Sequence, residues 1–551
     1  MAPGILVSIL FHTSHLPKGK RVKRRRENPL ALLVFTPSPV SERFRYDSDW
    51  NCVDEIRVQM GSRLKSQVGD DDKISQLPDA VLSHILSFLA TKDAVRTSIL
   101  STRWKNIWAS VPYLDFEHKY SHEPGYRSDH DGFVSFVDRV LYYRDSSDIQ
   151  RFRLHFTCFD EDSSHVDGWV RTAIRRNVVE LDLHVNVMAW AGEKMFELPK
   201  SVFLCKTLVV LKLTSSCFSY APPKSGCFPN LKFLHIRIDY PDKDLMEKLF
   251  TYFPLLEDLT IEGKMPSDLS CKFKLFVPEL KKLSINLDFV GTCEDPYEYY
   301  FSINSPKLEF LNLRVDILPS ILLDNAKPLV KAVVDFDYHE AILHEHFRIR
   351  ATKILAAISN VEQLSLSVHL FDASCIPAFD NLIHLKLVLR DCYGWEVLAE
   401  LLKRTPNLEC LVLEHKPDGD CNSDNEENSE DGANLVDNEN LEDAEDKANT
   451  EDNENSDNEE TSEDEEYSEH PWWNCQESVP VCLLSHLKTI FIRGFKGRRD
   501  EMQVAKYLLK NGEVLKNMTI YMGDLMCSKY KVYIEFLLFE KGSRTCRVQF
   551  V

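Results

Sequence analysis

The sequence predicts an α/β solenoid that follows a small N-terminal three-helix module and leads into a small C-terminal α+β module. Three observations support this fold class. A short apolar pattern recurs eleven times between residues 149 and 413, with its middle positions 21 to 32 residues apart. Apolar residues in the stretch 72–118 follow helical spacing instead. From residue 477 onward, strand and helix patterns alternate again after a long acidic interruption.

Composition is that of an ordinary globular protein, with 44 % hydrophobic and 28 % charged residues. The longest apolar runs, such as Ile5 to Phe11, are far shorter than the ~20 residues that a membrane helix needs. The 15 cysteines include no Cys-x-x-Cys pair, which argues against a zinc finger or a redox motif. Their odd number, their scatter and the lack of a signal peptide favour reduced thiols. We therefore expect the protein in the nucleus, the cytoplasm or both, with no membrane partner.

Residues 1–69 are predicted to form a disordered basic tail, because they show little sustained periodicity. Their apolar start precedes the charges, which is the reverse of a secretory signal. The basic cluster consists of Lys20, Arg21, Lys23, Arg24, Arg25 and Arg26. Such a cluster is typical of nuclear import or of nucleic-acid contact. Three interpretations stay open: a solvated charge run in a disordered tail, a nuclear import signal, and an Arg-rich mitochondrial presequence.

Three short helices are predicted within residues 72–118. Leu77-Pro78-Asp79 opens the first, because proline suits the first helical position and an acidic residue complements the positive end of the helix dipole. Thr91 and Ser101 can cap the second and third helices, and Val111-Pro112 ends the third. So small a module buries little of its own apolar surface. It is either a helical cap on a larger domain or a docking module whose apolar face belongs to a partner.

The motif Ile74-Ser75-x-Leu77-Pro78-Asp79, followed by helically spaced leucines and by Ser101-x-Arg103-Trp104-x-x-Ile107-Trp108, resembles a plant-type F-box. The resemblance implies binding to the Skp-type adaptor of a Skp–cullin–F-box ubiquitin ligase, and through the adaptor to the cullin. Chains of this type often begin just before the motif, where Met60 stands, so whether residues 1–59 are translated is left open. The residues predicted for the adaptor-binding face, or for the small core behind it, are Leu77, Pro78, Leu82, Ile85, Leu86, Leu89, Leu100, Trp104 and Trp108.

The segment 133–416 is predicted to be an irregular array of leucine-rich repeats. In each unit, three apolar residues are separated by two other residues and then by one, as in Leu208-Leu211-Leu213. The spacing centres near 25, within the ~20–29 residues expected for such repeats. Each unit supplies a short strand, and stacking buries what one unit cannot bury alone. An ordinary α/β domain is the alternative. The middle residues of the eleven patterns are Phe152, Leu181, Leu211, Leu234, Leu259, Leu283, Leu311, Ala332, Leu364, Leu385 and Leu411.

Residues 417–470 are predicted to be a disordered acidic insertion. From Asp418 to Glu469 there are 24 Asp and Glu against one Lys, so this segment contributes −23 to the net charge of −20. The rest of the chain is therefore close to neutral. With almost no aromatic or β-branched residues, the insertion cannot offset the entropy of ordering.

The last segment, 477–551, is predicted to contain a further repeat-like strand at Leu487-Ile490-Ile492, then a helix at 500–511, a strand at 518–521, a helix at 530–538 and a strand at 546–551. Its stretches Leu487–Phe495, 508–520 and Gly542–Cys546 resemble the FBD module that follows leucine-rich repeats in many plant F-box proteins. The resemblance to the plant F-box/FBD/leucine-rich-repeat family thus runs from about Asp72 to the end, apart from the acidic insertion. It does not say what an FBD module does.

Catalytic motifs are missing from the sequence. There is no Gly-x-Ser-x-Gly, no Gly-rich phosphate loop and no His-Glu-x-x-His; in the nearest match, His339-Glu340-Ala341-Ile342-Leu343-His344, the second His comes one residue too late. We therefore expect a non-catalytic substrate-recognition subunit without metal or cofactor, whose F-box binds the adaptor and whose repeats bind a protein target. A ubiquitin-independent nuclear interaction scaffold is the first alternative. A small-molecule receptor, which would show a pocket with converging Arg or Lys, is the second. No nucleic acid is expected as a partner, and repeat surfaces follow no code that would name the target.

Overall fold

A computed structural model of the chain describes two compact units, Met1–Val361 (unit 1) and Glu362–Val551 (unit 2), each of which is treated by itself. The described residues are 74, 76–118, 126–159, 162–187, 196–215, 218–219, 228–239, 253–266, 272–290, 300–315, 320–324, 328–336, 345–368, 376–389, 395–415, 479–523 and 528–551. The basic cluster, the acidic insertion and the pair His339 and His344 lie outside these residues.

Unit 1 begins with the N-terminal module, which contains two short α-helices, α3 (Asp79–Leu86) and α4 (Thr91–Arg96). A 3₁₀ turn, η1 (Thr97–Ile99), follows α4 directly. Where the sequence predicts the third helix, the chain forms a 3₁₀ helix, η2 (Trp104–Ser110). Pro78 stands immediately before α3, and the first main-chain hydrogen bonds of α3 run back to its carbonyl. Proline suits this position because the helix start leaves its N–H groups without intrahelical partners.

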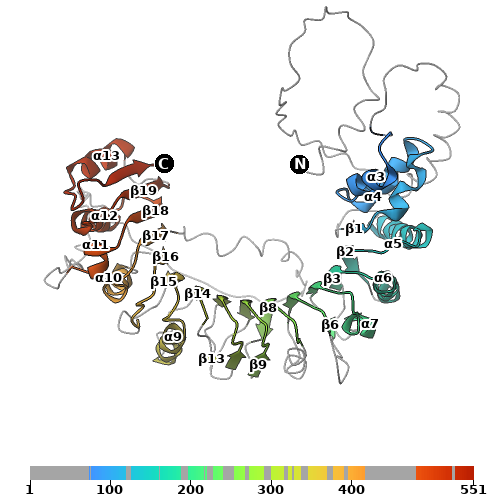
Figure 1. Cartoon of the computed structure of the whole chain (residues 1–551), viewed down its shortest axis with the longest axis horizontal. Coiled ribbons are helices and arrows are strands. Elements are labelled where there is room, and N and C mark those ends of the chain that lie inside the picture. Colours follow the sequence, from blue (N-terminus) through green and yellow to red (C-terminus); the bar gives the residue numbers. More distant parts are fainter. Residues whose placement is uncertain are drawn as a thin grey trace, which may run out of the picture. The chain divides into compact units, whose positions relative to one another are not determined.

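In the described part of unit 1, nine parallel strands form the main sheet, each paired with its neighbour in the chain order of the repeats (Figure 1). They are β1 (Tyr113–His118), β2 (Arg151–Cys158), β3 (Glu180–Val187), β5 (Val210–Ser215), β7 (Phe233–Ile238), β8 (Asp258–Pro266), β10 (Lys282–Val290), β12 (Phe310–Val315) and β14 (Lys331–Phe336). Side chains alternate between the two faces of a strand. The apolar residues of each repeat consequently share one face, and all eleven predicted middle residues, in both units, are buried.

The first strand, β1, was missed by the sequence prediction, which assigned its residues to the helical module. Val111, Leu114 and Phe116 have the same apolar spacing as the eleven repeats, and all three are buried. β1 pairs in parallel register with β2, so that Leu114 lies opposite Phe152. The repeat sheet therefore begins directly at the end of the helical module.

The apolar face of the unit 1 sheet is covered by helices and short strands (Figure 1). The helices are α5 (Tyr126–Tyr143), α6 (Ser163–Arg175), α7 (Lys200–Phe203) and α9 (Glu345–Ala357). Phe136 of α5 packs on Phe116 of β1, and Trp169 of α6 packs on Phe156 of β2. Three further strands, β9 (Lys272–Phe276), β11 (Tyr300–Asn304) and β13 (Ser320–Asp324), form a separate parallel sheet, and β4 (Phe196–Glu197) pairs with β6 (Phe218–Ser219). The sequence did not predict these strands, because their apolar residues follow no repeat pattern.

Unit 2 continues the same alternation. Its parallel strands are β15 (Gln363–Val368), β16 (His384–Leu389), β17 (Cys410–His415), β18 (Thr489–Phe495), β19 (Asn517–Met522) and β20 (Arg547–Phe550). Its helices are α10 (Trp395–Arg404), α11 (Val481–Ser485), α12 (Arg499–Asn511) and α13 (Lys529–Leu538). β18 pairs in register with β17. The C-terminal segment thus extends the sheet of β15–β17 as further α/β units, and the predicted separate α+β arrangement is wrong.

Candidate protein-binding surfaces

The nine residues predicted for the F-box face divide by burial. Leu82, Leu86, Leu89 and Trp104 form the core of the N-terminal module together with Ala94, Ile107 and Val111. Leu77 and Trp108 are half-buried against this core, and Ile85 is half-buried. Only Pro78 and Leu100 are exposed. The predicted set therefore holds four core residues and two that are freely accessible to a partner.

Three further large apolar side chains of the module are exposed, and the prediction did not include them: Val81, Phe88 (58 % exposed) and Ile99 (54 %). Pro78, Val81, Ile85 and Phe88 are spaced i, i+3, i+7 and i+10, which places them along one side of α3. This spacing is legible in the sequence. These residues are displaced by one position from the buried stripe of Leu82, Leu86 and Leu89. The sequence alone does not show which of the two adjacent apolar stripes packs into the module.

A polar contact fixes the start of α3 against the start of η2. The Arg103 guanidinium donates hydrogen bonds to the main-chain carbonyl of Leu77 and, over 3.2 Å, to the Asp79 carboxylate. The Trp108 indole N–H donates to the Lys105 carbonyl at 3.0 Å. Together these bonds hold Leu77 and Pro78 at the edge of the apolar core.

The N-terminal module is joined to the repeat sheet by several hydrogen bonds. The Asp115 N–H on β1 donates to the Thr91 hydroxyl at the start of α4 over 2.7 Å, and the Gln150 N–H donates to the Pro112 carbonyl over 2.8 Å. Arg144, after α5, donates to the Val111 carbonyl and, over 3.2 Å, to the Asp148 carbonyl. Burial lowers the pKa of the Arg144 guanidinium to about 10, which still leaves it charged at neutral pH. The module and the first strands therefore form one continuous structure.

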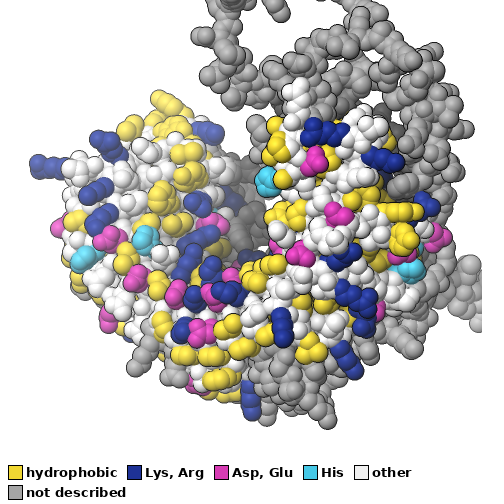
Figure 2. Space-filling model, turned by 45° about the vertical axis from the view of Figure 1, so that its right-hand side comes forward, with side chains coloured by type: hydrophobic (Ala, Val, Ile, Leu, Met, Phe, Trp, Pro, Cys, Tyr) yellow, Lys and Arg dark blue, Asp and Glu magenta, His cyan; other side chains and the backbone are white. Residues whose placement is uncertain are grey.

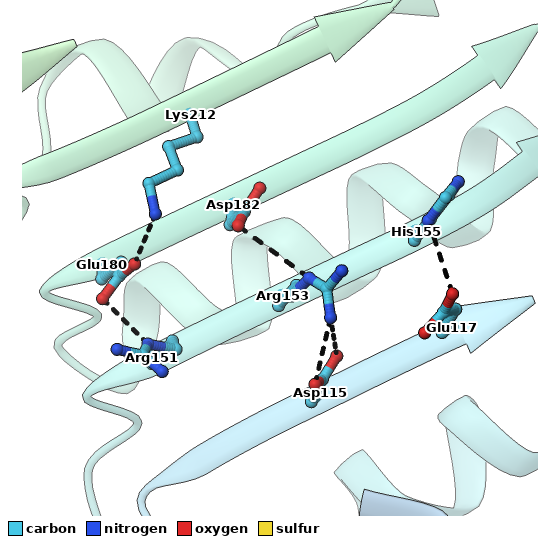
Figure 3. Close-up of polar contacts among 8 residues, drawn as sticks. All are labelled: Asp115, Glu117, Arg151, Arg153, His155, Glu180, Asp182 and Lys212. Atoms are coloured by element: carbon cyan, nitrogen blue, oxygen red, sulfur yellow. Dashed lines mark hydrogen bonds and ion pairs between the residues drawn. The ribbon is translucent and has the colours of Figure 1, made fainter. Parts of the chain in front are cut away.

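The exposed face of the unit 1 sheet carries a ladder of ion pairs (Figure 3). Arg153 on β2 lies between Asp115 on β1, at 3.3 Å, and Asp182 on β3, at 4.0 Å. Glu180 on β3 accepts hydrogen bonds from Arg151 at 2.8 Å and from Lys212 on β5 at 3.1 Å. The parallel register sets residues of equal position in each repeat opposite one another. Opposite charges therefore alternate from strand to strand.

The pKa values of the acidic side chains in this ladder depend on their burial and on the charged side chains beside them. Burial alone would raise the pKa of Glu180, but the hydrogen bonds from Arg151 and Lys212 outweigh it and hold that pKa below its usual range. Burial raises the pKa of Asp182, and Lys212 and Arg153 only partly offset it. The face thus presents paired charges of both signs rather than a field of one sign.

A histidine pair continues the ladder. The rings of His155 and His184 lie 4.0 Å apart, and His155 Nδ1 lies 3.9 Å from the Glu117 carboxylate. Burial lowers the pKa of His184 to about 4, and His155, Arg237 and Arg153 add to the effect. His184 is therefore a neutral imidazole at physiological pH.

A groove of about 330 Å³ lies between α5 and α6. Its walls include Tyr142 and Trp169, and the Trp169 indole donates to the Asp138 carboxylate at 2.6 Å. None of its eight lining residues is Lys or Arg, so this groove does not show the converging Arg or Lys that would indicate a small-molecule receptor. Within the described ranges, no group of three or more His, Cys, Asp or Glu is arranged to hold a metal ion. Among the helices that the structure describes, none is both long and apolar enough to cross a bilayer.

Together, the helical module and the strand-by-strand repeat sheet define an F-box protein with leucine-rich repeats, and comparison with known proteins agrees. The F-box domain model matches residues 74–116, and the FBD model matches 476–520. The model of the leucine-rich repeats of the FBD-associated F-box protein At5g56370 matches 166–327. The chain belongs to the plant F-box/FBD/leucine-rich-repeat family.

Among its relatives is the F-box/LRR-repeat protein At4g14103 of Arabidopsis thaliana, which is 32 % identical over 63 % of this chain and 92 % of the relative. The putative F-box/LRR-repeat protein At5g41840 of the same plant is 33 % identical over 64 % of this chain and 71 % of its own length. The F-box/FBD/LRR-repeat protein At4g26340, also from Arabidopsis thaliana, is 29 % identical over 81 % of this chain and 91 % of the relative.

Proposed function

We propose that this protein is the substrate-recognition subunit of a Skp–cullin–F-box ubiquitin ligase. Its F-box binds the Skp-type adaptor, its repeats form an α/β solenoid that binds a protein target, and other subunits transfer ubiquitin. The observation that carries the proposal is the set of exposed apolar residues on the F-box, in a module whose own core is already filled by Leu82, Leu86, Leu89 and Trp104. Exposed apolar side chains that gather on one face mark a protein-binding site.

The joint between the F-box and β1 supports the same function. Only Val111 and Pro112 separate η2 from β1, and hydrogen bonds from Arg144 and Gln150 brace this junction. A target held on the sheet would then stay at a defined place relative to the adaptor. Holding two reactants in place replaces a bimolecular search by a local one.

The ion-pair ladder of β1–β5 is the surface we assign to the target. Its charges of both signs are suited to selecting a protein surface of complementary pattern. A nucleic acid would instead favour a patch of Lys and Arg without acidic neighbours. The target itself can be identified by affinity purification with the proteasome inhibited.

The adaptor face is tested by substitutions at residues that differ in burial. Phe88→Ala and Leu100→Ala should each weaken binding of the full-length protein to a Skp-type adaptor by roughly thirtyfold, as expected for apolar anchors at an interface, with little change in stability. The double variant Leu77→Ala/Pro78→Ala should weaken binding as well, because these residues also set the start of α3. Isothermal titration calorimetry measures the affinity, and circular dichroism monitors the fold.

Two further variants serve as controls. Leu204→Ala removes an equally exposed apolar side chain far from the F-box in the chain and should leave adaptor binding unchanged. Trp104→Ala should instead destabilise the module, by about 3–5 kcal/mol, because Trp104 is only 2 % exposed. Adaptor binding at wild-type strength by folded Phe88, Leu100 and Leu77/Pro78 variants would contradict the proposal and favour a ubiquitin-independent scaffold.

We further propose that the protein enters the nucleus as well as the cytoplasm, on the basis of the basic cluster in the N-terminal tail. Replacing Arg24, Arg25 and Arg26 by Ala in a full-length fluorescent fusion should reduce the nuclear signal, because import receptors read clustered positive charge. An unchanged nuclear fraction would show that the cluster is only a solvated charge run.

A further inference from the structure

Helix α13 of unit 2 is apolar on two opposite faces. Val532 and Phe536 point into the unit and are buried, and the Phe536 ring lies 5.2 Å from that of Phe550 on β20. The opposite face carries the four residues that we call the α13 stripe: Tyr530 (73 % exposed), Ile534 (40 %), Leu537 (83 %) and Leu538 (77 %). Their spacing of i, i+4, i+7 and i+8 makes them neighbours along one side of the helix. Figure 2 shows hydrophobic side chains gathered at the end of unit 2 where Figure 1 labels α13.

A helix with two apolar faces is not expected to leave one of them exposed to solvent. A helix that is apolar all round is normally buried on both sides. α13 already buries Val532 and Phe536 on its inner side, and the four residues of the α13 stripe leave a second apolar side in contact with solvent. The α13 stripe therefore fits a surface that another protein covers.

The charges beside the stripe indicate which protein covers it. Lys531 and Glu535 follow Tyr530 and Ile534 by one position each, so both lie along the same edge of the stripe. If two such helices pack face to face in antiparallel fashion, a two-fold axis through Ile534 sets Tyr530 of one opposite Leu538 of the other. The same axis keeps the charged edges of the two helices on the same side of the helix pair. Each Lys531 then lies near the Glu535 of the second copy. A two-fold interface requires this kind of self-complementarity.

We propose that the α13 stripe docks against the α13 stripe of a second copy of this chain, in antiparallel orientation. An anionic membrane fits less well, because an interfacial helix of that kind carries mainly Lys and Arg on its polar edge. The alternation of Lys531 and Glu535 instead matches its own copy. This inference does not rest on the proposed function, since it concerns unit 2 alone.

The test uses the full-length protein and sedimentation equilibrium over a range of concentrations. The wild type should be a dimer that dissociates on dilution. Leu537→Glu/Leu538→Glu should raise the dissociation constant of the dimer at least thirtyfold, because it replaces the two most exposed apolar side chains of the stripe by charges, and loss of apolar anchors has effects of this size at other interfaces. Leu204→Glu, an exposed leucine of unit 1, is the matched control and should leave the dimer intact. Thermal unfolding by circular dichroism confirms that each variant is folded.

Charge exchange tests the antiparallel arrangement. Lys531→Glu and Glu535→Lys should each weaken the dimer, because each sets like charges opposite one another. Mixing these two single variants, or combining both changes in one chain, should restore it. Single variants that dimerise like the wild type would overturn the antiparallel arrangement.

The remaining outcomes are equally decisive. A wild type that stays monomeric up to its solubility limit overturns the proposal, as does a dimer that survives Leu537→Glu/Leu538→Glu. Binding of a monomeric wild type to phosphatidylserine vesicles, lost in the same variant, would assign the stripe to a membrane instead. Adaptor affinity measured on the same variants should not change. If adaptor binding fails while the dimer behaves as stated, only the proposed ligase function is overturned.

Discussion

His118, at the end of β1, shows how strongly one side chain depends on its surroundings. It is buried, with its ring 5.0 Å from Phe133 and 5.5 Å from His130. His130 in turn lies 2.8 Å from the buried Asp162 carboxylate. Burial and the neighbouring His130 lower the pKa of His118 to about 4, and the carboxylates of Asp129 and Asp162 oppose the shift only in part. His118 is therefore folded into unit 1 as a neutral ring.

This environment makes stability depend on pH. The unfolded chain takes up a proton on His118 near its ordinary pKa of 6.5, whereas the folded chain does so only near 4. Between these values the unfolded state binds more protons, so the free energy of unfolding should fall as the pH is lowered, by on the order of 3 kcal/mol in total. Urea unfolding at pH 7 and pH 4.5 measures the loss.

The matched comparison is His118→Phe, which keeps an aromatic ring but cannot take up a proton. Its stability should fall less than that of the wild type over the same pH range. His118→Asn, a neutral polar replacement, checks that the difference does not come from the added phenyl ring. Equal losses in the wild type and both variants would show that other groups set the pH dependence.

For individual side chains, the sequence predicted less than it did for secondary-structure elements or for the order of the domains. Apolar spacing identified the residues that make α3 a helix, but it could not separate Leu82 and Leu86, which are buried, from Val81 and Phe88, which are exposed. Burial depends on where η2 packs, and that contact joins residues more than twenty positions apart. The partners of Arg153 and Glu180 depend in the same way on strand register, which the repeat spacing only outlines.

Two glycines in regular elements illustrate how backbone geometry limits substitution. Gly494 lies at an irregularity in β18 and has φ of +70°. A Cβ atom there would lie 2.5 Å from the carbonyl oxygen of His415 on the neighbouring strand β17. Gly168 lies inside α6, and a Cβ atom there would meet nothing within 4 Å.

The two positions should therefore respond in opposite directions to alanine. Gly494→Ala should destabilise unit 2 by about 1–3 kcal/mol or more, because it combines a strained backbone with a contact against main chain. Gly168→Ala should stabilise unit 1 by about 0.5–1 kcal/mol, since alanine is the better helix former. Hydrogen exchange read separately for α6 and β18 tests both, and a harmless Gly494→Ala would mean that β17 can move away from β18.

Among elements, the strongest predictions came from strict apolar spacing. The predicted repeat strands, the helix at 500–511 and the helix at 530–538 correspond to elements of the structure, with ends that differ by a few residues. β1 was missed because its pattern stands next to the tryptophans of the F-box and was attributed to that module. The strands β9, β11 and β13 were missed because each is only five residues long, so its few apolar residues, such as Phe273 and Leu275 in β9, do not stand out from loop sequence.

For the whole chain, the order of F-box, repeats and FBD follows from the sequence, and the acidic insertion between β17 and β18 is evident from charge alone. Contacts between described residues on either side of the insertion join the two parts of the unit 2 sheet. Lys488 lies 2.6 Å from Glu409, and the Cys482 thiol donates to the Leu402 carbonyl at 3.3 Å. The flanking residues thus connect β17 and β18 directly.

Deleting Asp418 to Glu469 should consequently leave unit 2 folded. The free energy of unfolding should stay the same or rise by about 1 kcal/mol, because shortening a long connection reduces the entropy lost on closing it only slightly. Thermal unfolding of the deletion variant against the wild type measures this difference. A large drop in melting temperature would show that the acidic residues pack against the folded part.

Because only two residues separate η2 from β1, each strand of the unit 1 repeat sheet lies at a fixed distance from the F-box. Neighbouring strands are ~4.8 Å apart, so β14, eight steps from β1, lies about 38 Å farther along the sheet. Under the proposed function, the position of the strand that binds the target determines which lysines of the target come within reach of the ubiquitin donor. Moving the binding residues by one repeat would shift that reach by a single strand spacing, and mass spectrometry of the modified lysines would read the shift.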